Sequence, residues 1–134
     1  MLYLLDTNTC IAYLNRSSQA VYDHLLEQSP EDVCICDVVK YELYYGAYKG
    51  TRTEKNLEKL QVLFGEFVSL PFEGEAAEIC GAIRAELQAK GTPIGAYDFQ
   101  IAAIALANNL TLVTHNTKEF ERVPGLSLVD WQVS

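Results

Sequence analysis

The sequence predicts an α/β protein in which a mostly parallel sheet of five strands carries helices on both faces. Short apolar runs alternate several times with longer segments of helical periodicity, which is the pattern of strands and helices around a parallel sheet. Residues 96–108 are apolar on every side after the first turn, so this helix belongs in the middle of the fold. A length of 134 residues without internal repeats or linkers predicts a single domain, residues 1–134.

The strands are expected where short apolar runs are bounded by turn residues. In chain order these runs are residues 2–5, 33–36, 67–70, 111–114 and 126–129. A turn at residues 29–32, which contains Pro30, separates the second strand from the helix before it.

The helices are expected where apolar residues recur at helical spacing between capping and stop residues. Ser17 or Ser18 caps the second helix, which buries Leu26, and Asp37 caps the third. The fourth helix buries Phe64, and Gly91 ends the fifth. In chain order the helices are residues 8–14, 18–28, 38–48, 53–64, 73–90 and 96–108, followed by a short helix or turn at residues 115–121.

Composition limits the class of protein. Ten Lys and Arg residues stand against eighteen Asp and Glu, a formal charge of −8 that argues against a surface binding polyanions everywhere. The four cysteines lie in apolar neighbourhoods without a CxxC pair, so we expect buried free thiols in a reducing cytosol. The apolar N-terminal run lacks a basic segment and contains Asp6, which predicts no signal peptide, and no window is long enough to span a membrane. We therefore expect a soluble, cytoplasmic protein without membrane contacts.

Asp6 is the most informative residue of the chain. It follows the apolar run at residues 2–5 and precedes two small polar residues, Thr7 and Asn8. Open parallel sheets bind their ligands at the carboxyl ends of strands, which is where Asp6 lies. Taken alone, Asp6 could equally be the N-cap of the helix that follows.

Four further polar residues occupy comparable positions. Asp98 lies in the first turn of the apolar helix, where the helix dipole stabilises a carboxylate, although a capping role is the alternative. Glu42 lies one turn into the third helix among apolar neighbours that leave little solvent-facing surface; an ordinary exposed Glu is the alternative. Asn116 and Glu119 follow the fourth strand and could instead form a capping box.

Carboxylates that converge on one sheet edge repel one another unless a cation neutralises them or one is protonated. Oxygen ligands without His or Cys favour Mg²⁺ or Mn²⁺ over softer metals. Such a site can activate water and stabilise the charge of a phosphodiester under in-line attack. The sequence therefore predicts metal-assisted phosphodiester hydrolysis.

Four blocks of the sequence carry a family resemblance. They are LLDTN at residues 4–8, YELYYG at 41–46, GAYDFQIAA at 95–103 and LVTHNTKEF at 112–120. In content, order and spacing they resemble the motif blocks of PIN-domain ribonucleases, specifically the VapC toxins of bacterial VapBC toxin–antitoxin modules, over nearly the whole chain. The resemblance implies a three-layer α/β/α sandwich and a Mg²⁺-dependent endoribonuclease that cuts transfer or ribosomal RNA to inhibit translation and growth. It also implies a homodimer and a cognate VapB-type antitoxin whose C-terminal segment occupies the groove beside the site.

Carried over position by position, Asp6 and Asp98 match the family's principal metal-binding acids, and Glu42 matches its second acid. These three are the expected metal ligands and catalytic groups. Many relatives have Asp where this chain has Asn116, so two alternatives remain open for the fourth group. Glu119 supplies the missing catalytic acid, or Asn116 orients a water molecule beside the metal. The residues expected to position ligands or substrate through hydrogen bonds are Thr7, Asn8, Thr114 and Asn116.

An acidic protein that cuts RNA needs local cations near its acidic site. The basic residues expected to contact RNA phosphates are Lys49, Arg52, Lys55, Arg84, Lys90 and Lys118. An ordinary solvated helix face is the alternative for residues 40–59, where acidic and basic residues alternate. A basic antitoxin peptide suits the same site, since clustered carboxylates bind arginine when RNA is absent. Attack by water in line with the 3′ oxygen predicts 5′-phosphate and 3′-hydroxyl products.

Other classes agree less well with the sequence. A haloacid-dehalogenase-like phosphatase needs a second Asp two residues after the first, and Asn8 occupies that place. His24 and His115 are the only histidines, and neither a GxSxG elbow nor a P-loop exists, which argues against serine-hydrolase and P-loop chemistry. The remaining alternative is a PIN fold that serves as a catalytically weak RNA- or protein-binding module, which Asn116 supports.

Overall fold

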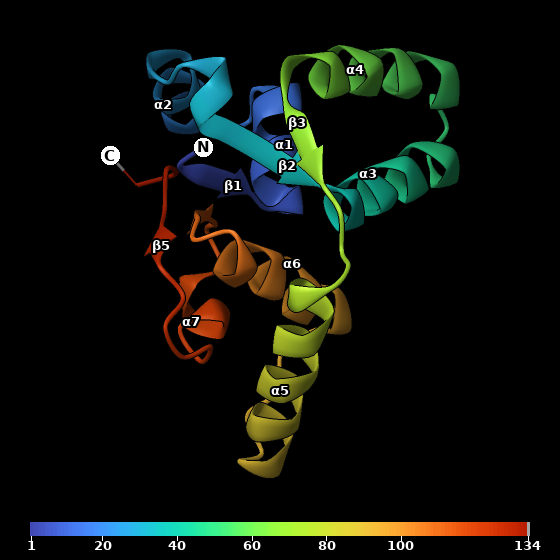
Figure 1. The fold of residues 1–134 in the computed structure, drawn as a ribbon. Coiled ribbons are helices and arrows are strands. Elements are labelled where there is room, and N and C mark those ends of the chain that lie inside the picture. The colour runs from blue at the N-terminus through green and yellow to red at the C-terminus, as the bar shows by residue number, and fades with distance from the viewer. Residues whose placement is uncertain (134) are drawn as a thin grey trace.

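Five strands form one sheet at the centre of the computed structural model, which describes residues 1–133 (Figure 1). Every neighbouring pair in that sheet is parallel. In chain order the strands are β1 (Tyr3–Leu5), β2 (Val33–Cys36), β3 (Val68–Leu70), β4 (Thr111–Val113) and β5 (Leu128–Val129). The predicted α/β class with a parallel five-stranded sheet is confirmed.

The strand order β3-β2-β1-β4-β5 creates a switch point in the middle of the sheet. The chain moves outward from β1 to β3, then returns to place β4 on the other side of β1, with Leu5 opposite Val113. Parallel sheets bind ligands at the carboxyl ends of the strands where the direction changes. Asp6 and Thr114, which follow β1 and β4, therefore lie at the expected ligand site.

Within residues 1–133, seven α-helices connect and cover the strands. In chain order they are α1 (Thr7–Asn15), α2 (Gln19–Glu27), α3 (Asp37–Lys49), α4 (Thr53–Glu66), α5 (Glu75–Ala89), α6 (Ala96–Ala107) and α7 (Thr117–Phe120), with a 3₁₀ turn at Pro30–Asp32. Because parallel crossovers are right-handed, the two directions of travel place helices on opposite faces. Figure 1 shows α1, α2 and α4 on one side of the sheet and α5, α6 and α7 on the other.

The helix α6 lies in the core, as its composition predicts. Five consecutive residues are at most 1% exposed; they are Ile101, Ala102, Ala103, Ile104 and Ala105. Phe99, in the preceding turn, is equally buried. A helix fixed so firmly on all sides holds its first turn, which contains Asp98, in one place.

Two predicted helix starts have different outcomes. Ser18 caps α2, because its hydroxyl accepts a hydrogen bond from the Val21 amide at 3.2 Å. The prediction that Asp37 caps α3 is wrong: the N-cap is Cys36, and Asp37 is the first helical residue. The Asp37 carboxylate instead accepts a 2.6 Å hydrogen bond from the hydroxyl of Ser69 on β3. This contact joins α3 to β3, and α3 starts one residue earlier than predicted.

The buried faces of two helices also differ from prediction. Leu26 on α2 is 63% exposed, because Val21 and Leu25 already form the buried ridge and Leu26 lies a further 100° around the helix. On α4, Leu63 is fully buried and Phe64 only partly so.

The cysteines are free and buried, as expected. No helix among residues 1–133 combines the length and the apolar character needed to cross a bilayer.

Candidate active site

Asp6 caps α1 and faces the switch point of the sheet at the same time. Its Oδ1 accepts a hydrogen bond from the Thr9 amide at 2.8 Å, and its own amide donates to the carbonyl of Val113 at 3.1 Å. The side chain is 5% exposed, and burial raises its pKa, although the hydroxyls of Thr114 and Thr9 act in the opposite direction. The capping and the functional interpretation of Asp6 are compatible, since the cap uses only Oδ1.

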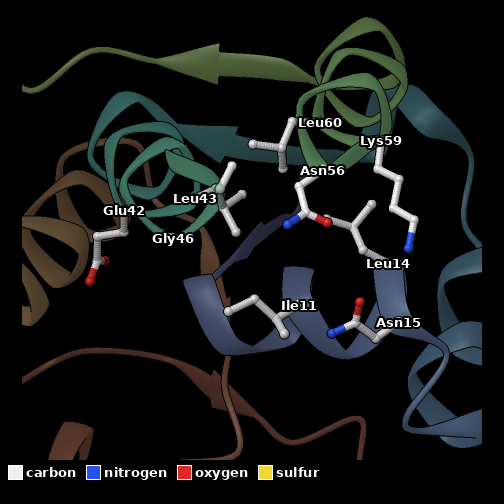
Figure 2. Close-up of a pocket in the computed structure, with 10 residues that line it drawn as sticks. Ile11, Leu14, Asn15, Glu42, Leu43, Gly46, Asn56, Lys59 and Leu60 are labelled. Carbon is white, nitrogen blue, oxygen red and sulfur yellow. The ribbon is translucent and has the colours of Figure 1, made fainter. Parts of the chain in front are cut away.

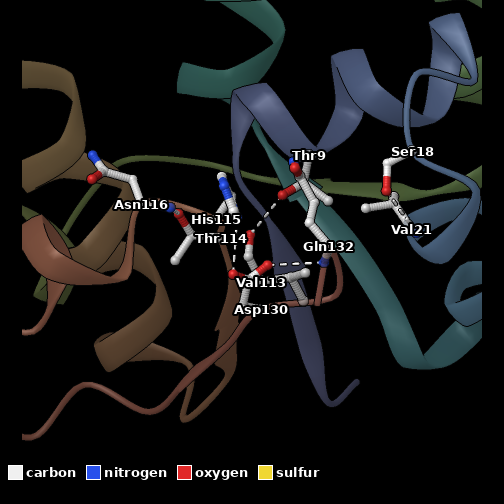
Figure 3. Close-up of polar contacts among 9 residues, drawn as sticks. All are labelled: Thr9, Ser18, Val21, Val113, Thr114, His115, Asn116, Asp130 and Gln132. Carbon is white, nitrogen blue, oxygen red and sulfur yellow. Dashed lines mark hydrogen bonds and ion pairs between the residues drawn. The ribbon is translucent and has the colours of Figure 1, made fainter. Parts of the chain in front are cut away.

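Hydroxyl groups fix the backbone around Asp6. The Thr9 hydroxyl donates to the carbonyl of Val113 at 3.1 Å, which ties α1 to β4 (Figure 3). Thr114 is fully buried, and its Oγ1 accepts a hydrogen bond from the Asn116 amide at 3.0 Å. Thr114 thus contacts both Asp6 and the segment after β4, in keeping with the positioning role expected for it.

Glu42 is anchored toward the site by α1. It is half-buried on α3, and its Oε1 accepts a 2.7 Å hydrogen bond from the hydroxyl of Thr7. Thr7 immediately follows Asp6, so this contact joins the end of β1 to α3. Glu42 is therefore not an ordinary exposed helix residue, whereas Asn8, the next residue of α1, is exposed to solvent.

Asp98 is the residue at which the carboxylates meet. Gly95 is the N-cap of α6, so Asp98 lies in the first turn and does not cap the helix. Its pKa is raised to about 7, first by burial and then by the negative charges of Glu119, Glu42 and Asp6. Three carboxylates, from the residue after β1, from α3 and from α7, thus act on Asp98 at the start of α6.

Glu119 holds the beginning of α6 rather than closing a capping box. Its Oε1 accepts a hydrogen bond from the Gly95 amide at 2.9 Å, and its Oε2 accepts one from Nδ2 of Asn116 at 2.6 Å. These two bonds lower the pKa of Glu119, so it carries its charge beside Asp98. Asn116 is the N-cap of α7 but makes no side-chain cap. The amide at 116 therefore serves to hold Glu119.

Asp130 is a carboxylate at this edge that the sequence analysis missed. It follows β5, its Oδ2 lies 2.9 Å from Nδ1 of His115, and its Oδ1 accepts a hydrogen bond from the Gln132 amide at 2.8 Å (Figure 3). Its negative charge contributes to the raised pKa of Asp6. The rule that identified Asp6, a polar residue directly after a strand, applies equally to Asp130 and would have found it.

The donor set suits a hard divalent cation. No Lys or Arg among residues 1–133 forms an ion pair with Asp6, Glu42 or Asp98, so their charge is not neutralised within the described chain. Over the same residues no three His, Cys, Asp or Glu side chains are grouped so that they could hold a metal ion. Mg²⁺ keeps several waters and needs only one or two carboxylates, so these separated oxygen donors remain suited to it.

The basic residues expected to contact RNA are not gathered in one patch. They lie around the connection between α3 and α4 (Lys49, Arg52, Lys55), on or at the end of α5 (Arg84, Lys90) and on α7 (Lys118). Lys90 pairs with Glu86 at 3.3 Å, and the Arg84 guanidinium lies 5.9 Å from the ring centre of Phe99. Figure 1 shows the far end of α5 well away from the connection between α3 and α4. Their contact with RNA stays a prediction.

An open pocket adjoins the carboxylates. It has a volume of about 230 Å³ and lies between α1, α3 and α4 (Figure 2). Its walls include Ile11, Leu14, Leu43 and Leu60, and Glu42 lies at one end. An apolar groove with a carboxylate at its end can bind an apolar peptide segment that carries a basic residue.

Comparisons with known proteins agree with this geometry. The PIN domain profile matches residues 3–126. The tRNA(fMet)-specific endonuclease VapC of Salmonella typhimurium is 38% identical over 129 residues, which cover 96% of this chain and 97% of that protein. Ribonuclease VapC2 of Rickettsia felis is 38% identical over 132 residues, or 98% of each chain.

A solved structure shows the same architecture. The crystal structure of DNA-bound VapBC from Salmonella typhimurium superposes with a TM-score of 0.92 at 39% identity and covers 98% of this chain and 99% of that chain. The chain therefore belongs to the PIN-domain family and, within it, to the VapC ribonucleases.

Proposed function

We propose that this protein is a Mg²⁺-dependent endoribonuclease toxin of a VapBC-type toxin–antitoxin module. The observation that carries the proposal is the placement of Asp6 directly after β1, beside β4, with Glu42 held next to it by the hydroxyl of Thr7. Carboxylates at the carboxyl edge of a parallel sheet that lack a basic partner favour a divalent cation. The VapC ribonucleases among the relatives support the same activity.

Asp6, Glu42 and Asp98 are the proposed metal ligands. When bound, Mg²⁺ would supply the positive charge that stabilises a phosphodiester under attack and would make water a better nucleophile. The protein holds these ligands through contacts that are already formed. Thr7 fixes Glu42 at 2.7 Å, and Glu119 fixes the Gly95 amide at the start of α6.

We propose transfer RNA as the substrate class. The relative from Salmonella typhimurium carries the name tRNA(fMet)-specific endonuclease and matches this chain over nearly its whole length. Cleavage should leave 5′-phosphate and 3′-hydroxyl ends, because water attacks in line with the 3′ oxygen.

The pocket in Figure 2 is the proposed binding site for a VapB-type antitoxin. Its apolar walls accept an apolar peptide segment, and an arginine at the end of that segment reaches Glu42 and its neighbours. The solved VapBC complex from Salmonella typhimurium supports this kind of partner. The homodimer remains a prediction, which the molar mass in solution tests.

A cytoplasmic location is proposed from the cysteines. All four are free and buried, which suits a compartment that keeps thiols reduced.

Cleavage of purified transfer RNA tests the proposed activity. We expect wild-type protein to cut with Mg²⁺ and not with a chelator, and Asp6→Asn or Asp98→Asn to abolish cutting. The matched control is Asp37→Asn, which removes a carboxylate at the same sheet edge that is bound to Ser69 instead of facing the site. Products that end in 2′,3′-cyclic phosphate would overturn the mechanism. RNA binding without any cleavage would assign the chain to the binding-module alternative.

A further inference from the structure

Two exposed tyrosines flank the carboxylates of the site. Tyr41 precedes Glu42 on α3, and Tyr97 precedes Asp98 on α6. Although they come from separate helices, their hydroxyls lie 3.2 Å apart, and their ring centres are 5.3 Å apart at 57°. Tyr41 is 51% exposed and Tyr97 is 42% exposed, so both side chains are accessible to a ligand from solvent.

The tyrosine pair is held together beside the acids. The Tyr97 hydroxyl donates a hydrogen bond to the hydroxyl of Tyr41, so the rings are fixed to one another across the space between α3 and α6. An aromatic surface next to a strongly acidic site suits a ligand that can stack without bringing further negative charge to the rings.

A nucleobase satisfies that requirement. The phosphates of RNA are repelled by this acidic protein, whereas each base has an uncharged π-face that stacks on aromatic side chains with little regard to sequence. Because each tyrosine is the chain neighbour of a carboxylate, a phosphate held at the carboxylates has its adjoining base within reach of the rings. The six basic residues are spread over separate elements, which leaves stacking as the local source of affinity.

We propose that Tyr41 and Tyr97 form a platform on which one unpaired base beside the cleaved bond stacks. The proposal rests on the proposed ribonuclease function and specifies how RNA is held there. Bases are free to stack on a protein only where RNA is single-stranded, in loops, bulges and ends. The platform therefore predicts cleavage within an unpaired segment.

The same helix offers a matched control. Tyr48 lies on α3 two turns after Tyr41 and is 65% exposed. A second copy of this chain docked along α3 would bury Tyr48 as well as Tyr41, whereas a base beside the carboxylates would leave Tyr48 free.

A cycle that pairs protein variants with base removal tests the platform. Binding of a fluorescent RNA hairpin is measured with Mg²⁺ in the Asp98→Asn background, which keeps the RNA intact. An abasic ribose replaces one loop nucleotide at a time. Each RNA is titrated with the Tyr41→Ala/Tyr97→Ala pair, the Tyr41→Phe/Tyr97→Phe pair and Tyr48→Ala, and the molar mass of every variant is recorded.

We expect the alanine pair to weaken binding of the intact hairpin by roughly 5- to 100-fold, the usual value of one stacked base. The phenylalanine pair, which keeps both rings, and Tyr48→Ala should stay within about twofold of the parent. Removal of one particular base should weaken RNA binding by the parent by the same factor. It should not weaken RNA binding by the alanine pair any further, because both changes delete the same contact.

The platform would be overturned if, at every loop position, the losses of RNA affinity from base removal and from the alanine pair added together. It would also be overturned if the alanine pair bound the intact hairpin as tightly as the parent. An equal loss with Tyr48→Ala together with a fall in molar mass would assign the surface to a second copy of the chain. Failure of wild-type protein to cut any RNA would refute the proposed function separately, because the binding cycle does not depend on cleavage.

Discussion

At the scale of single residues, three of the four carboxylates of the site also have a structural contact. Asp6 caps α1, Glu42 accepts the Thr7 hydroxyl, and Glu119 holds the Gly95 amide. Asp98 differs, because its largest influences are burial and the charges around it. It is therefore the residue whose protonation is expected to report on the site.

The stability of the metal-free protein should fall as pH rises toward neutrality. The pKa of Asp98 moves from 3.8 to about 7 on folding, so between these values the folded protein keeps a proton that the unfolded chain has released. The folded protein therefore gains less and less stability from this retained proton as pH rises toward 7. Thermal unfolding in chelator should show this fall in wild type and a flatter profile in Asp98→Asn, while Asp37→Asn keeps the wild-type slope. Addition of Mg²⁺ should raise the melting temperature more above about pH 7 than well below it.

A melting temperature with the same pH profile in wild type and Asp98→Asn would contradict the raised pKa. A Mg²⁺ effect that is independent of pH would contradict the role of Asp98 as a ligand.

The contact between Asn116 and Glu119 predicts the outcome of restoring the acid found in many relatives. Asn116→Asp replaces a donor 2.6 Å from Oε2 of Glu119 by a second negative charge. We expect the free energy of unfolding of the metal-free protein to fall by about 1 kcal/mol or less, because this contact is exposed to solvent. Adding Glu119→Gln should recover most of this loss, because the glutamine amide can donate to Asp at 116. Urea unfolding in chelator gives both values.

A double variant no more stable than Asn116→Asp alone would show that the side chains at 116 and 119 are not coupled.

At the scale of elements, the short connection from α5 to α6 controls where Asp98 lies. A Cβ added to Gly95 would lie 3.0 Å from Oδ2 of Asp98. The φ of Gly95 is −60°, so the constraint is space for the carboxylate and not backbone conformation. The amide of Gly95 is also the group that Glu119 holds. Gly95 therefore leaves room for the Asp98 carboxylate and also binds Glu119 through its amide.

Gly95→Ala should displace the Asp98 carboxylate and slow RNA cleavage by roughly 10- to 100-fold, a typical effect of a small misplacement at a reacting centre. The melting temperature should change little, because Ala tolerates this φ. Gly81→Ala on α5 is the matched control, since nothing lies within 4 Å of its added Cβ. The measurements are the RNA cleavage rates and melting temperatures of both variants. A wild-type cleavage rate in Gly95→Ala would refute the claim that a Cβ at position 95 displaces the Asp98 carboxylate.

The existence of the elements could be predicted because apolar periodicity is a local property of the chain. Their ends could not, because contacts between distant segments set them. Asp37, for example, is the first residue of α3 and not its cap, and its carboxylate is bound to Ser69, which lies 32 residues away. Phe64 and Leu26 were expected to be buried, but Phe64 is only partly buried and Leu26 is exposed. The reason is related: periodicity gives the angle of a buried stripe only approximately, and packing against neighbours fixes it.

At the scale of the whole molecule, the parallel sheet explains why Asp6 could be singled out, whereas Asp98 was singled out by its place in the first turn of the buried helix α6. The sheet brings the carboxyl ends of its strands to one edge, so residues far apart in sequence share a site by topology alone. The same rule points to Asp130, which was overlooked. The contact between Tyr41 and Tyr97 had no comparable signal, because their meeting depends on how α3 and α6 pack.

Because the net charge is −8, six basic residues were predicted to contact RNA near the acidic site. Charge composition, however, does not say where such residues lie in the fold. The structure spreads them over the connection between α3 and α4, the helix α5 and the helix α7. We therefore expect this protein to bind RNA mainly at its site and not through a broad basic surface.

The central claim is that Asp6, Glu42 and Asp98 hold one divalent ion. Anomalous diffraction from crystals grown with Mn²⁺ tests this claim most directly. We expect an anomalous peak at coordination distance from Asp6 and Asp98 in wild-type crystals, with Glu42 beside it, and no such peak in Asp6→Asn crystals. Wild-type crystals with Mn²⁺ bound elsewhere, or with no peak at these carboxylates, would contradict the metal site on which the proposed ribonuclease depends.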